Sequence, residues 1–106
     1  EELPHEYFTR EGDDVYYDLH LSFPELVLGT EVVVPTLFNS TKVIIDPGTQ
    51  HGKLLRMRGK GIKRLNQNTF GDQIIRISVI VPKHVNKKEK ELLEELKTLP
   101  DFKPHA

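Results

Sequence analysis

The chain of 106 residues contains no cysteine. A disulfide framework, a thiol nucleophile and a cysteine-ligated zinc site are therefore excluded. The chain also lacks any apolar run near the roughly 20 residues that a membrane-spanning helix needs, since runs such as Val32–Val34 have only the length of a strand. It begins Glu-Glu-Leu-Pro, with no signal-peptide pattern and no initiating Met. We therefore expect a fragment of a longer cytoplasmic protein that makes no use of a membrane.

Residue patterns for catalysis or metal binding are equally scarce. No serine stands in a nucleophile elbow, and the glycine-rich stretch Arg58–Gly61 lacks the helix start of a phosphate-binding loop. The histidines lie far apart and show no ligand spacing: His5, His20, His51, His84 and His105. We therefore expect no enzymatic activity, no metal site and no cofactor in this chain.

The formal net charge of −1 conceals an uneven distribution of charge. Residues 1–46 carry ten acidic and two basic side chains, whereas residues 47–106 carry six acidic and thirteen basic ones. Residues 53–64 form the densest basic stretch, which keeps weak nucleic-acid binding open as an alternative function. That alternative is disfavoured because the stretch contains no aromatic side chain on which a base would stack.

Five segments have the composition of β-strands separated by turn residues. In residues 14–22 apolar and polar side chains alternate, which is typical of a half-buried strand. The other segments are residues 30–34, 42–45, 53–58 and 73–81, with Gly, Pro, Asn and Asp between them. Their short spacing favours an antiparallel two-sheet sandwich over a fold of alternating strands and helices. The sequence therefore predicts a mainly β domain over residues 1–82.

Two short helices are predicted from capping signals. Ser22 followed by Glu25, with Gly29 as a stop, predicts one internal helical turn. Asn86 followed by Glu89 predicts the start of a C-terminal helix that Pro100 ends. We assign this helix and its tail to a separate segment, residues 83–106, and expect the tail from residue 101 to be loose.

Several short motifs occur one after another along nearly the whole chain. They are Phe8–Val15, Leu21–Gly29, Val34–Leu37, Ile45–Gln50, Leu55–Gly61 and Gly71-Asp72. Together they resemble the second C-terminal domain of the DnaJ/Hsp40 co-chaperones, of the bacterial type. The chain departs from the family at Asn39-Ser40, where an Asp-Gly-type turn is usual.

The resemblance implies a domain that binds unfolded polypeptide for Hsp70 (DnaK), which it meets through the full-length protein. This chain contains neither the His-Pro-Asp tripeptide of the family's ATPase-stimulating segment nor the family's cysteine-rich zinc module. We expect the zinc module only in the rest of a parent protein. By position in the repeat, the peptide-contacting residues would be Tyr17, Leu19 and Val34. The alternative is that these three side chains belong to the sandwich core, since an apolar face of period two is usually buried.

The C-terminal helix carries the second predicted site. The resemblance implies a homodimer, and the segment after this repeat commonly joins the two copies. The apolar stripe available for this contact is Leu92, Leu93, Leu96 and Leu99, with Phe102. Packing of the helix on its own sandwich is the alternative for this segment. For the whole chain, a general protein-interaction module without a chaperone role stays open.

Overall fold

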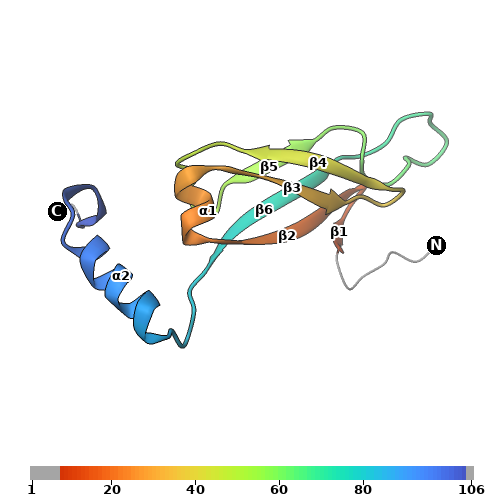
Figure 1. Cartoon of the computed structure of the whole chain (residues 1–106). Coiled ribbons are helices and arrows are strands. Elements are labelled where there is room, and N and C mark those ends of the chain that lie inside the picture. The colour runs from red at the N-terminus through yellow and green to blue at the C-terminus, as the bar shows by residue number, and fades with distance from the viewer. Residues whose placement is uncertain (1–7, 105–106) are drawn as a thin grey trace.

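The computed structural model describes residues 8–104 as two stacked sheets, with a C-terminal helix beyond one end (Figure 1). The four-stranded sheet has the order β1-β2-β6-β5. Its strands are β1 (Phe8–Glu11), β2 (Asp14–Ser22), β5 (Leu54–Met57) and β6 (Gln73–Ile80). The second sheet pairs β3 (Thr30–Pro35) with β4 (Ser40–Ile45). The predicted mainly β, two-sheet fold is confirmed.

Strand β1 was not among the predicted strands. Only Phe8 of its four residues is buried, so the segment lacks the alternation by which a strand is recognised. Its partner defines it instead, because β1 pairs antiparallel with β2 around the turn at Gly12 and Asp13. Gly12 adopts a φ of +64°, a conformation that glycine reaches without strain.

The two central strands, β2 and β6, run parallel, with Val15 opposite Gln73 and Ser22 opposite Ile80. This pair departs from the antiparallel pairing that the sequence predicted. The reason is the connection, because the chain builds the whole second sheet and β5 between the two strands before it returns. At its start β6 is buried on both faces, at Ile74 and Ile75, as is common for strands of parallel pairs.

The core lies between the two sheets and under the first helix. It consists of buried side chains from both sheets and that helix: Leu19, Leu21, Leu26, Val34, Ile45, Ile75 and Ile77. A buried polar residue also links the layers, since the side-chain amide of Gln73 donates to the carbonyl oxygen of Pro35 at 2.9 Å. The alternation predicted for β2 is confirmed, because Val15, Leu19 and Leu21 are buried on one face.

Helix α1 (Phe23–Leu28) closes one end of the sandwich, and its predicted cap is confirmed. The backbone N–H of Glu25 donates to Ser22 Oγ, and the backbone N–H of Ser22 donates to the Glu25 carboxylate at 3.0 Å. The Ser22 hydroxyl also donates to this carboxylate, at 2.9 Å, and the two hydrogen bonds that the carboxylate accepts from Ser22 lower the pKa of Glu25. Gly29 ends the helix with a φ of +84°, where a side chain would meet the Ile45 carbonyl and Pro47.

Helix α2 (Lys87–Lys97) begins with the predicted capping box, in which Asn86 and Glu89 exchange two hydrogen bonds of 2.8 Å. The helix extends beyond the sandwich (Figure 1). The prediction of a loose tail from residue 101 is wrong for residues 101–102, and residues 105–106 of that tail lie outside the described residues. Pro100–Phe102 form a short 3-10 helix, and the Phe102 ring packs edge-on against Phe23 of α1 at 5.9 Å. No helix within residues 8–104 has the length and apolarity needed to cross a membrane.

Candidate functional site

The three predicted peptide contacts lie on the inward faces of the sheets. Val34 has no exposed surface and Leu19 is 9% exposed, and both belong to the core. Tyr17 is half-buried and packs against Phe8, with ring centroids 5.9 Å apart. This placement agrees with the core alternative for all three residues. In this conformation Val34 has no exposed surface that a peptide could contact. The role of these three residues as peptide contacts therefore stays a prediction.

The predicted dimerisation residues have a different environment. Leu92 and Leu93 are each 50% exposed, and no residue of α2 is buried. The alternative in which α2 packs fully on its own sandwich is therefore not what the described residues show. A helix of this length is marginal in water without a packing partner. Its leucine stripe is thus available for a contact from outside the chain.

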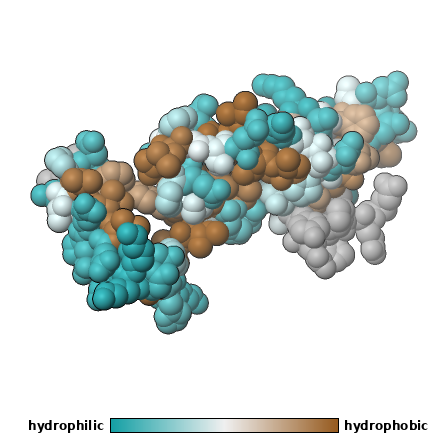
Figure 2. Space-filling view, viewed as in Figure 1, coloured by the Kyte–Doolittle hydropathy of each residue, from teal (hydrophilic) through white to brown (hydrophobic). Residues whose placement is uncertain are grey.

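Further apolar side chains lead from the sheet to α2, and no sequence pattern singled them out. Between the end of β6 and the start of α2 the chain carries three exposed apolar residues, Ile80, Val81 and Val85. An open hollow of about 220 Å³ lies beside α1, with Phe23, Val27 and Val79 in its lining. The space-filling view shows apolar residues over this end of the molecule (Figure 2). Residues 80–102 are called the C-terminal apolar segment below, after the exposed apolar side chains that they carry.

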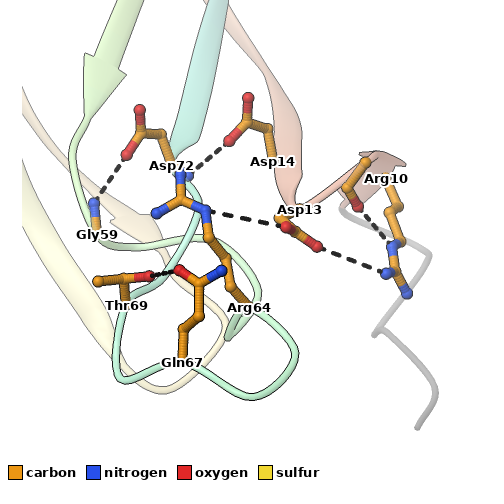
Figure 3. A network of polar contacts seen from close by, with 9 residues as sticks. Arg10, Asp13, Asp14, Gly59, Arg64, Gln67, Thr69 and Asp72 are labelled. Carbon is orange, nitrogen blue, oxygen red and sulfur yellow. Dashed lines mark hydrogen bonds and ion pairs between the residues drawn. The ribbon is translucent and has the colours of Figure 1, made fainter.

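The basic stretch predicted at residues 53–64 forms no continuous positive track. Arg56 pairs with Asp72 at 2.6 Å, and the Arg64 guanidinium lies 3.9 Å from Asp13. The second oxygen of the Asp72 carboxylate accepts the backbone N–H of Gly59 at 3.0 Å (Figure 3). Part of the basic charge is therefore used inside the domain, which disfavours phosphate binding along this stretch.

The same contacts hold residues 59–72, called the 59–72 loop below, against the turn between β1 and β2. The backbone N–H of Ile62 donates to the Asp13 carbonyl at 2.8 Å. The backbone N–H of Asp72 donates to the Asp14 carboxylate at 2.7 Å (Figure 3). Gly71 lies so close that a Cβ there would overlap the Asp13 carbonyl group. The glycines and Asp72 of this motif therefore have a structural role.

Replacement of Asp72 by asparagine is expected to lower the melting temperature at neutral pH. The N–H of Gly59 and the guanidinium of Arg56 lower the pKa of Asp72, so its stabilising effect is complete above the ordinary aspartate pKa of about 3.9. This effect is lost as the pH falls through the lowered pKa. Thermal unfolding between pH 7 and pH 2 should show the two proteins converging in acid.

Asp18→Asn provides a matched control, because Asp18 forms an exposed ion pair with Arg76 at 2.7 Å. Exposed pairs contribute little to stability. A loss in Asp72→Asn no larger than that in Asp18→Asn would contradict the structural role of Asp72.

Known proteins are similar in sequence to this chain over nearly its whole length. The DnaJ C terminal domain family matches residues 1–82. The chain belongs to this DnaJ family. It is 52% identical to the "Chaperone protein DnaJ" of Salinibacter ruber over 98% of the chain, and 50% identical to that of Chlorobium limicola over the same share. The protein of this name from Bacteroides thetaiotaomicron is 46% identical over 98% of the chain.

The chain spans about a quarter of the length of these DnaJ relatives, 27% and 26% of the first two. Within residues 8–104, no group of three or more His, Cys, Asp and Glu side chains is placed to hold a metal ion. The absence of a cofactor and of catalytic activity stays a prediction for this DnaJ domain.

Proposed function

We propose that this chain is the part of a bacterial DnaJ co-chaperone that contacts non-native polypeptide and joins two copies of the protein. Membership of the DnaJ C-terminal domain family supports the co-chaperone assignment. The half-exposed leucine stripe of α2 is the observation that supports the joining of two copies. Hsp70 (DnaK) is the proposed partner of the full-length protein, and the bacterial cytoplasm is its proposed location.

The proposed dimer contact uses the C-terminal apolar segment. Its central residues are those predicted from the sequence: Leu92, Leu93, Leu96, Leu99 and Phe102. Burying one exposed leucine contributes about 1.5–3 kcal/mol before the costs of ordering and association. The packing of Phe102 on Phe23 supports this contact, because it ties the end of the segment to the sandwich and lowers the ordering cost.

Strand addition is the proposed mode of polypeptide contact. Each strand of the two-stranded sheet pairs with only one neighbour, so β3 and β4 each have an edge without a strand partner among the described residues. An added peptide strand would bind mainly through backbone hydrogen bonds, which tolerate many sequences. Contact with the buried Leu19 and Val34 would require the two sheets to separate, whereas Tyr17 is only half-buried.

An aggregation assay tests the proposed polypeptide binding. Several unrelated denatured proteins are diluted into buffer with increasing amounts of the chain, and light scattering is followed. The chain is expected to lower the scattering of every client in proportion to its concentration, while an unrelated β-protein of similar net charge does not. Suppression of a single client would indicate a module with one defined ligand, and suppression of none would contradict client binding by this domain.

A further inference from the structure

The end of the sandwich farthest from α2 carries an exposed apolar group that the proposed function has not used. Phe38, in the turn between β3 and β4, is 70% exposed, and Leu65, in the 59–72 loop, is 85% exposed. Phe38 packs edge-on against Phe70 with ring centroids 5.9 Å apart, which joins the turn to the loop. Apolar residues are visible among hydrophilic ones at this end (Figure 2).

An open hollow of about 340 Å³ lies in the same loop, lined by Lys63, Asn66, Gln67 and Asn68. Gln67 Oε1 accepts a hydrogen bond from the Thr69 hydroxyl at 3.1 Å, so its amide nitrogen keeps its donors for a ligand (Figure 3). Side-chain amides both donate and accept, as peptide groups do. The lining of the hollow therefore suits the main chain of an extended peptide of any sequence.

The charge around this hollow is positive. No acidic residue occurs in the sequence between Asp46 and Asp72. Lys60 and Lys63 form no ion pair with any residue in 8–104, whereas Arg64 lies 3.9 Å from Asp13. The exposed Lys63 lies opposite Phe70 and lines the hollow, and Lys60 belongs to the same loop, so this end favours a ligand that is acidic as well as apolar.

We propose that Phe38, Leu65, Phe70 and the amide-lined hollow form a client-contact surface, called the loop tip, for extended non-native segments with apolar and acidic side chains. This inference rests on the proposed function. Apolar client side chains pack on Phe38 and Leu65, while acidic ones pair with Lys60 and Lys63. A nucleic acid or a lipid surface fits less well, because affinity for phosphates grows with the number that are neutralised and only Lys63 among the basic residues lines the hollow.

The test measures fluorescence anisotropy of two labelled synthetic peptides with the same leucine and phenylalanine content, one containing aspartate and the other lysine. The whole chain is expected to prefer the acidic peptide. Phe38→Ser with Leu65→Ser should weaken that binding about tenfold. The control, Leu28→Ser with Leu54→Ser, removes two exposed leucines elsewhere and should leave the affinity within about twofold.

Charge reversal gives a second readout that does not depend on the apolar substitutions. Lys60→Glu with Lys63→Glu should shift the preference to the basic peptide, and circular dichroism should show an unchanged fold in every variant. Equal peptide binding by the chain and both loop-tip variants overturns this inference and leaves the proposed function standing. If the unaltered chain binds neither peptide and does not suppress aggregation, this inference and the proposed function are both overturned. Binding to phosphatidylglycerol vesicles or oligo-dT in place of both peptides overturns the choice of ligand.

Discussion

Replacement of Leu92 and Leu96 by aspartate is expected to convert the proposed dimer into a monomer while the sandwich stays folded. The two leucines lie one turn apart on the exposed stripe of α2, and α2 contributes no buried residue to the domain. Placing carboxylates in an apolar contact removes leucine burial and adds desolvation of charge. The dimer dissociation constant should therefore rise at least about a hundredfold, as measured by sedimentation velocity across a concentration series.

The matched control is Lys87→Asp with Lys90→Asp. It places two aspartates on α2 outside the leucine stripe, in the first turn, where the helix dipole favours acidic side chains. This variant should remain dimeric, and a chain that ends at Asn86 should be monomeric. A Leu92→Asp, Leu96→Asp protein that still sediments as a dimer would show that the two copies meet elsewhere.

Gly71→Ala should destabilise the sandwich more than any other single methyl addition in the 59–72 loop. The new Cβ would overlap the Asp13 carbonyl oxygen and lie 2.5 Å from the carbonyl carbon. Both are backbone atoms of a carbonyl group that already accepts the hydrogen bond from Ile62, so neither side yields easily. Overpacking of this kind costs about 3 kcal/mol, which lowers the melting temperature of a domain of this size by more than about 10 °C.

Gly48→Ala separates this steric effect from the conformational cost of losing a glycine. Gly48 has a φ of +82°, but no atom lies within 4 Å of the position that a Cβ would take there. Alanine at this position should cost only about 1–2 kcal/mol, through the left-handed conformation alone. Thermal unfolding followed by circular dichroism compares the two variants. A melting temperature of Gly71→Ala at or above that of Gly48→Ala would contradict the close packing of the loop.

Local features of the fold were predictable because they depend on neighbours in the sequence. The alternation in residues 14–22 predicted β2 with its buried face, and the capping boxes predicted the starts of α1 and α2. The parallel direction of β6 was not predicted, because Arg76 and Ser78 interrupt its apolar residues and give it the alternation of an antiparallel strand. Strand β1 was missed because a single buried Phe8 produces no pattern.

The surfaces were predictable to a smaller extent. The leucine spacing identified the α2 stripe, whereas the packing of Phe102 on Phe23 and the exposure of Ile80 could be found only once the fold had placed them. The resemblance indicated Tyr17, Leu19 and Val34 as peptide contacts, but an apolar face of period two is also typical of core residues, and the structure buries Leu19 and Val34. Phe38 lies in the turn between β3 and β4 and Phe70 in the 59–72 loop, far apart in the sequence, so no local pattern relates them.

The parallel pairing of β2 with β6 has a consequence for synthesis and folding. Register partners such as Val15 and Gln73 are separated by most of the domain, so the central strand of the larger sheet emerges last from the ribosome. Until then β1 and β2 form only a hairpin, which is marginally stable by itself. Such long-range pairing slows folding and leaves strand edges uncovered meanwhile. A domain proposed to bind non-native polypeptide is thus itself incompletely folded until β6 has been translated.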